Sequence, residues 1–137
     1  MKQDIASVMV SNPTWINSNA SLNKAINLMN STQVSHLLVR DGDRLVGVIS
    51  KNDLLEKFFS IVQMSSGKIY NDKILENTKV SELIKRDPIT LTAKDSVKHA
   101  IDLMLKNKIH CIPIINEENE PIGIMTPTDV MKAWEAD

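Results

Sequence analysis

The sequence predicts an α/β fold made of two copies of one unit, and the main observation behind this prediction is an internal repeat. The segment GVISKNDL at Gly47–Leu54 returns as GIMTPTDV at Gly123–Val130. Pro13 aligns with Pro88 at an offset of 88 − 13 = 75 residues. A copy of about 50 residues cannot bury much apolar surface alone, so we expect both copies to form one compact module.

Each copy is expected to open with a short helical turn that leads into a first strand. The apolar positions of this lead-in recur at the same offset: Ile5, Val8 and Met9 in copy one, and Val80, Leu83 and Ile84 in copy two. A Pro-containing extended stretch follows in both copies, around Pro13 and Pro88. Proline favours extended backbone in the residue before it, which suits entry into a strand.

An amphipathic helix follows in each copy. Apolar residues recur there at i, i+3, i+4 and i+7, the spacing of one helix face. They are Leu22, Ala25, Ile26 and Met29 in copy one, and Val97, Ala100, Ile101 and Met104 in copy two. Ser21 and Asp95 are the candidate N-cap residues of these two helices.

Two strands are predicted next in each copy. The apolar runs HLLVR and LVGVIS are separated by a polar turn at Asp41–Asp43, and the runs CIPII and PIGIMT by one at Asn116–Glu120. Such runs on either side of a short polar turn are typical of paired strands. Pro113 is expected at an edge position or a strand end, because it has no N–H to donate.

A second helix is predicted to complete each copy. Apolar-rich helical stretches cover Leu54–Val62 and Val130–Trp134, and Asn52 and Thr128 are their candidate N-caps. The predicted order in each copy is strand, helix, strand, strand, helix. Copy one then spans residues 1–62 and copy two residues 79–137. The connector 63–78 has no counterpart, and a further helix is expected around Lys68–Leu75.

The composition excludes several classes of protein. Sixteen basic and 17 acidic residues give a formal net charge of −1, without a basic run that would bind nucleic acid. No apolar run approaches about 18 residues, so no membrane span is expected, and the start of the chain, with Asp4, does not resemble a signal peptide. We therefore expect a cytoplasmic protein. Cys111 lies in an apolar strand-like run, where a buried, inert thiol is expected.

Motifs for catalysis or for a metal are absent from the sequence. It contains no recognisable nucleophile–base motif, P-loop or Gly-rich dinucleotide turn, so we do not expect an enzyme. His36, His99 and His110 are not spaced as ligands of one metal ion.

Two tandem units in this order resemble the cystathionine β-synthase (CBS) domain pair, also called a Bateman module. Each unit ends in Gly-apolar-apolar-[Ser/Thr]-x-[Ser/Thr/Asn]-Asp-apolar, and the resemblance covers about Asp4 to Trp134. It implies a regulatory module, usually not an enzyme, that binds adenine nucleotides or related adenosyl ligands in clefts between the repeats. It also implies a flat homodimer, formed through helices that here carry Phe58, Phe59 and Trp134.

The repeated motif carries side chains suited to a nucleotide. Asp129, in the first turn of a helix, can accept hydrogen bonds from both ribose hydroxyls, and charge-assisted bonds are the stronger kind. Thr126 and Thr128 lie where backbone N–H groups and the helix dipole favour a phosphate. These three residues form the better of two candidate sites, which we call site 2.

Copy one supplies a weaker candidate, site 1. It keeps Ser50 and Asp53 but has Asn52 in place of the second hydroxyl, which departs from the family pattern. The resemblance places residues of the opposite repeat beside each carboxylate. Beside Asp129 these are Met9, Asn12, Thr14, Val34 and Ser35; beside Asp53 they are Ile84, Asp87, Ile89, Ile109 and His110.

The sequence therefore predicts a sensor of an adenosyl ligand, with AMP, ADP or ATP expected, that signals to an effector protein of unknown identity. The cation candidates His36, Lys51, Lys108 and His110 are scattered, which favours a mononucleotide or a weakly charged ligand over a polyphosphate. Two alternatives remain open. In the first alternative the chain is a ligand-free dimerisation or interaction scaffold. In the second it is a sensor of S-adenosylmethionine or a metal ion.

Overall fold

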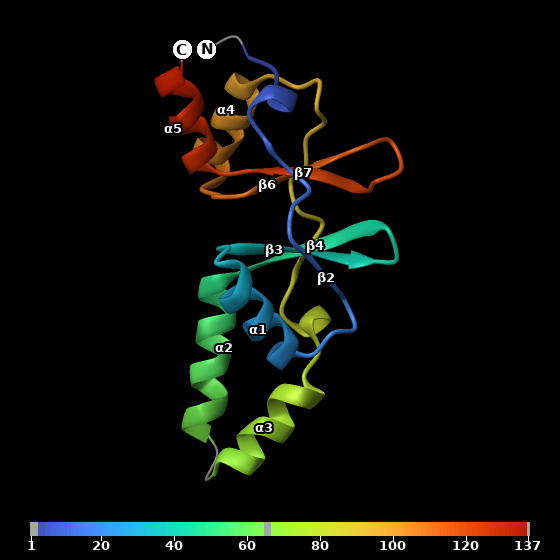
Figure 1. Cartoon of the computed structure of the whole chain (residues 1–137), viewed down its shortest axis with the longest axis vertical. Helices are drawn as coiled ribbons and strands as arrows, with labels where there is room; N and C mark the ends of the chain where they lie inside the picture. The colour runs from blue at the N-terminus through green and yellow to red at the C-terminus, as the bar shows by residue number, and fades with distance from the viewer. Residues whose placement is uncertain (1–2, 65–66, 137) are drawn as a thin grey trace. The chain divides into compact units, whose positions relative to one another are not determined.

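A computed structural model describes residues 3–64 and 67–136 of the chain (Figure 1). The chain divides into two compact units. Among the described residues, unit 1 contains 3–13, 43–45 and 88–136, and unit 2 contains 14–42, 46–64 and 67–87. Each unit thus combines the body of one repeat with the lead-in of the other.

Unit 2 contains a mixed sheet and three α-helices. Its sheet has the order β2-β3-β4-β5, with β2 parallel to β3 and β5 antiparallel to β4. Helices α1, α2 and α3 pack against one another, as Figure 1 shows. The elements are β2 (Trp15–Asn17), α1 (Leu22–Thr32), β3 (His36–Asp41), β4 (Arg44–Ser50), α2 (Lys51–Met64), α3 (Lys68–Asn77), the 3-10 turn η2 (Val80–Glu82) and β5 (Lys85–Arg86).

Unit 1 contains a smaller antiparallel sheet and two α-helices. The sheet has the order β1-β7-β6, and α4 packs against α5. The elements are the 3-10 turn η1 (Ile5–Ser7), β1 (Val10–Ser11), α4 (Val97–Asn107), β6 (Ile112–Ile115), β7 (Pro121–Met125) and α5 (Pro127–Ala136). The predicted helices, the helical turns and the two polar loops are therefore present in both copies.

The lead-in segments are exchanged between the repeats, and equivalent hydrogen bonds hold both of them. In unit 1 the amide of Ile5 donates to the carbonyl of Asp95 at 3.0 Å; in unit 2 the amide of Val80 donates to the carbonyl of Ala20 at 2.8 Å. Ile5 and Val80 are both fully buried, each in the core of its own unit. The exchange places Met9 and Asn12 in the same unit as Asp129.

The first strand of copy two is reduced to a single bridge, contrary to the prediction. Leu91 forms a parallel bridge with Ile114, whereas copy one has the regular strand β2. The cause is Pro113, which aligns with Leu38. The amide of Leu38 donates to the carbonyl of Thr14 at 3.2 Å, and a proline cannot make this bond. Pro113 does lie in an edge strand, β6, as expected.

The caps of three helices also differ from the prediction. The N-cap of α4 is Ser96 rather than Asp95, and its hydroxyl accepts from the amide of His99 at 3.1 Å. Helices α2 and α5 begin at Lys51 and Pro127, so Asn52 and Thr128 lie inside the first turn and do not cap it. Proline suits the first helical position, because the N–H it lacks would have no partner there. The predicted cap of α1, Ser21, is confirmed.

The helical periodicity correctly predicts the buried faces. In α1 Leu22, Ala25 and Met29 are buried, and the equivalent residues of α4 are buried as well. Ile26 and Ile101, at the i+4 position, lie only partly buried at the edge of each core. Within residues 3–64 and 67–136, no helix is long and apolar enough to cross a membrane.

Candidate functional site

Thr126 and Asp129 form the best-defined part of the predicted site, at the start of α5. The backbone amide of Thr126 donates to Asp129 Oδ2 at 2.8 Å, and the Thr126 hydroxyl donates to the same oxygen at 3.0 Å. Asp129 is only 8% exposed. The bond from the Thr126 amide to the Asp129 carboxylate is one half of a capping box; the Thr126 hydroxyl donates to the carboxylate instead of accepting from the helix. The carboxylate is held in one orientation.

The equivalent pair in copy one is arranged differently. Here the amide of Asp53 donates to the hydroxyl of Ser50 at 3.1 Å, so the hydroxyl acts as an acceptor towards the helix. Thr126 instead acts as a donor towards its carboxylate. Asp53 is also more exposed than Asp129. The two copies therefore differ in how firmly the carboxylate is oriented, and site 2 has the more constrained one.

Met9 and Asn12 flank strand β1, which pairs with the strand that leads to Thr126. Val10 lies opposite Ile124, and Ser11 opposite Gly123. A Cβ atom on Gly123 would lie 2.5 Å from Met9 Sδ and 3.1 Å from the carbonyl oxygen of Val10. Position 123 thus requires glycine so that β1 can approach β7. Of the predicted site 2 residues, unit 1 holds Met9, Asn12 and the Thr126–Asp129 segment.

Cys111 lies close enough to Asp129 for the two groups to interact electrostatically. Burial, and then the negative charge of Asp129, raises the pKa of the Cys111 thiol to about 12. A thiol with such a pKa stays protonated at neutral pH and is a poor nucleophile. The sequence prediction of an inert thiol agrees with this, but it did not connect Cys111 with Asp129.

The remaining predicted contacts of site 2 lie in unit 2. They are Thr14, Val34 and Ser35. Within that unit, the carbonyl of Ser35 accepts from the amide of Lys51 at 2.8 Å, which ties it to the start of α2. The place of these residues beside Asp129 stays a prediction.

The predicted residues of site 1 are divided in the same way. Ser50, Asn52, Asp53, Ile84 and Asp87 lie in unit 2, and Ile89, Ile109 and His110 in unit 1. His110 is exposed, whereas Ile89 and Ile109 are partly buried. Across the part of the chain that the structure describes, no three His, Cys, Asp or Glu side chains gather as a metal site would require.

Comparison with known proteins identifies the family. A family model for the CBS domain matches residues 5–60 and 80–136. Among curated proteins, the chain is 33% identical over 117 residues to the uncharacterized protein MJ1232 of Methanocaldococcus jannaschii, which covers 85% of this chain and 34% of that protein. The chain spans 24% to 39% of the length of the first three such relatives.

Solved structures share the fold. The crystal structure of CBSX2 in complex with AMP is 25% identical, with a TM-score of 0.80, over 97% of this chain and 96% of that one. The CBS domain pair of protein MJ0100, in complex with 5′-methylthioadenosine and S-adenosyl-L-methionine, is 21% identical, with a TM-score of 0.78, over 96% and 99%. With its fold, its doubled motif and the family match all in agreement, this chain belongs to the CBS domain family, with one CBS domain at residues 5–60 and a second at residues 80–136.

Proposed function

We propose that this protein is a regulatory sensor that binds an adenosyl ligand, with Asp129 as the ribose-binding residue. The observation that carries the proposal is the buried carboxylate held by Thr126 at the N-terminus of α5. Both of its hydrogen bonds use Oδ2. A carboxylate has about four lone-pair positions, so Oδ1 is the acceptor assigned to the two ribose hydroxyls.

The first turn of α5 supplies the groups assigned to a phosphate. Thr128 is exposed, and helix geometry leaves its N–H without an intrahelical acceptor. This amide, the Thr128 hydroxyl and the helix dipole together favour an anion. The Thr126 hydroxyl already donates its proton to Asp129, so we assign it the role of positioning the carboxylate.

AMP is the ligand that these groups fit best among AMP, ADP and ATP. One amide and one hydroxyl suit a single phosphate, and the charged residues of the first turn include no cation for further phosphates. CBSX2, a 25% identical protein of the same fold, binds AMP, which supports this choice.

Ligand titration against two matched variants tests the proposal. We expect AMP at about 100 times its Kd to stabilise the wild type by about 2.7 kcal/mol in thermal unfolding, and Asp129→Asn to abolish this effect. The control is Asp95→Asn, because Asp95 accepts hydrogen bonds from the amide and hydroxyl of Thr92 in the same geometry. Asp95→Asn should keep the AMP response. A response that survives in Asp129→Asn would contradict the proposal.

The alternatives make different predictions in the same experiment. A ligand-free scaffold would respond to none of AMP, ADP, ATP, NAD and S-adenosylmethionine. A sensor of S-adenosylmethionine, which the MJ0100 CBS pair holds, would respond to that compound more strongly than to AMP. A metal sensor would lose stability when a chelator is added.

We also propose that the protein is a homodimer formed through its helices and that it passes the ligand signal to an effector protein. Large apolar side chains on α2 and α5 are exposed, among them Phe59 at 56% and Trp134 at 70%. Exposed large apolar side chains on a helix are typical of a protein interface. Light scattering after size exclusion should give twice the monomer mass. The ligand can bias an effector only by its differential affinity, typically about 1–3 kcal/mol.

A further inference from the structure

The loop between β6 and β7 of copy two contacts the start of β4, in the hairpin of copy one. The amide of Leu45 donates to the carbonyl of Asn119 at 2.9 Å, and the side-chain amide of Asn119 donates to the carbonyl of Leu45 at 3.1 Å. Leu45 is buried and Asn119 half-buried, so water competes little for these bonds. Asn119 therefore pairs with both main-chain groups of Leu45, as a neighbouring strand would.

Leu45 needs this partner because β5 does not extend far enough to pair with it. Strand β5 pairs Arg86 with Gly47 and ends there. The same antiparallel register would place Pro88 opposite Leu45, and a proline has no N–H to donate to the Leu45 carbonyl. The side chain of Asn119 supplies the missing donor.

Hydrogen bonds within the loop hold Asn119 in position. The side-chain oxygen of Asn116 accepts from the amides of Glu118 and Glu120 at 3.0 and 2.9 Å, and its side-chain amide donates to Glu120 Oε1 at 2.9 Å. Asn119 has a φ of +61°, in the left-handed region that asparagine adopts more readily than most residues. Asn116 thus orders the loop, and Asn119 makes the contact with Leu45.

The contact has no counterpart in the opposite direction. Pro121 aligns with Leu45 at an offset of 121 − 45 = 76 residues, and without an N–H it cannot make the equivalent bond to the turn of copy one. The loop of copy two, residues 116–120, is also longer than that of copy one, residues 42–43. The two repeats therefore differ at this point.

This contact assigns the tip of the copy-one hairpin, residues 43–45, to unit 1, although the rest of the hairpin belongs to unit 2. We infer that Asn119 is a latch: its two bonds to Leu45 hold the hairpin tip in unit 1 and make the two units unfold in a single cooperative transition. Strand β7 leads from the latch to Thr126, and β4 leads from Leu45 to Ser50. The latch therefore joins the strands that end at the two candidate sites.

Asn119→Asp is the variant that opens the latch. Aspartate has the size of asparagine and also adopts positive φ, but it places a carboxylate oxygen against the carbonyl of Leu45 where a donor is needed. Asn107→Asp is the matched control, because the side-chain amide of Asn107 donates to the carbonyl of Leu103 at 3.0 Å within α4. It loses a bond of the same kind away from the hairpin.

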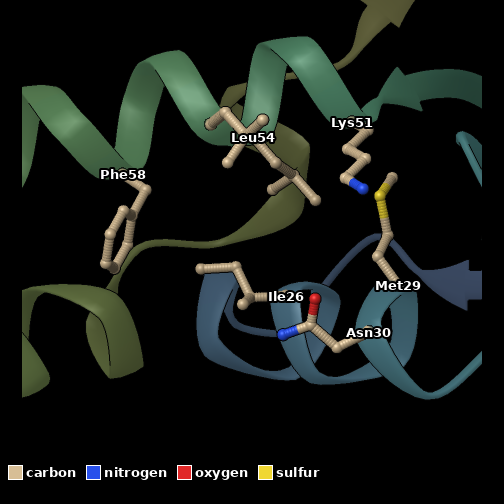
Figure 2. Close-up of a pocket in the computed structure, with 7 residues that line it drawn as sticks. Ile26, Met29, Asn30, Lys51, Leu54 and Phe58 are labelled. Carbon is tan, nitrogen blue, oxygen red and sulfur yellow. The ribbon is translucent and has the colours of Figure 1, made fainter. Parts of the chain in front are cut away.

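Two buried methionines report on the two units separately. Met29 is 4% exposed in the core of unit 2, and Figure 2 shows it beside the pocket between α1 and α2. Met104, at the equivalent position of α4, is 8% exposed in the core of unit 1. The NMR signals of their methyl groups, assigned with Met29→Leu and Met104→Leu, give one urea midpoint for each unit.

The latch predicts coincident midpoints in the wild type and in Asn107→Asp, as for a single cooperative transition. In Asn119→Asp the two midpoints should separate by at least about 0.3 M urea. If that variant does not fold, Asn119→Gly replaces it, since glycine keeps the positive φ and removes only the side chain. Coincident midpoints in the variant, or separate midpoints in the wild type or in Asn107→Asp, would overturn the inference.

Discussion

The amide and the hydroxyl of Thr126 both donate to a single oxygen of Asp129, at 2.8 and 3.0 Å. This arrangement serves folding as well as the proposed ligand site, because it closes the N-terminus of α5 around a buried charge. The same residue pair therefore contributes to the stability of α5 and to the orientation of the carboxylate in the proposed ligand site.

Removal of the Thr126 hydroxyl should destabilise the protein without changing its shape. Thr126→Val has the same size but lacks the donor, and hydrogen bonds to a charged group that is 8% exposed are hard to replace with water. We expect a loss of about 1–2 kcal/mol in the free energy of unfolding by urea. Thr126→Ser, which keeps the hydroxyl, should lie within about 0.5 kcal/mol of wild type. Equal stability of the two variants would refute the argument.

Alanine at position 123 should displace strand β1. The new Cβ would lie 2.5 Å from Met9 Sδ and 3.1 Å from the carbonyl oxygen of Val10, and the second of these is backbone that cannot turn aside. We expect a loss of about 1–3 kcal/mol, as for other overpacked sites. Faster hydrogen exchange of the Val10 and Ser11 amides would accompany it. Gly42→Ala tests a different effect, since that position has open space but a φ of +61°.

The decrease in the free energy of unfolding at alkaline pH should depend on Cys111. Burial and the charge of Asp129 raise the pKa of this thiol from 9.0 to about 12. Between these two pH values the unfolded chain binds fewer protons than the folded one, so stability falls as pH rises, by up to about 1.4 kcal/mol per pH unit. Below pH 9 the thiol is protonated in both states and its full contribution remains.

Urea unfolding of the wild type and Cys111→Ser at several alkaline pH values checks this prediction. The difference between the two proteins should change with pH above 9 and stay constant below it. Groups other than Cys111 contribute equally to both curves and cancel in the difference. A difference that is independent of pH would show that the thiol does not titrate in this window.

Serine N-caps at equivalent positions should contribute equally to the stability of α1 and α4, the first helix of each copy. The hydroxyl of Ser21 accepts from Lys24 N and that of Ser96 from His99 N, each at 3.1 Å. We expect Ser21→Ala and Ser96→Ala each to cost about 1 kcal/mol in unfolding free energy. Unchanged stability in Ser96→Ala would indicate that Asp95, as predicted from the sequence, caps α4 instead of Ser96.

Local patterns predicted the helices because their signals lie within a few residues of each other. The buried faces of α1 and α4 follow from apolar spacing. The Thr-x-x-Asp pattern at Thr126 and Asp129 is also a capping signal, but the prediction named Thr128 as the cap. The repeat held further information that the prediction did not use. Ser96 aligns with Ser21, and Pro113 aligns with a residue whose amide is needed for strand pairing.

Two features could not be read from local pattern. The proximity of Cys111 to Asp129 depends on how β6 and α5 pack, which no spacing in the sequence specifies. The exchange of the lead-ins depends on pairing between Val10 and Ile124, which are 124 − 10 = 114 residues apart. Both repeats have equivalent strands, so the sequence alone allows β1 to pair within its own repeat.

The exchanged lead-ins also have a consequence for synthesis of the chain on the ribosome. Every described segment of unit 2 has been made once residue 87 has emerged. Residues 3–13 are made before any of these segments, but the partner strand of β1, β7, is made only at Pro121–Met125. Contacts across such a separation form slowly. Residues 3–13 are therefore made before unit 2 but find their partner strand after it, and unit 2 can fold while unit 1 is still incomplete.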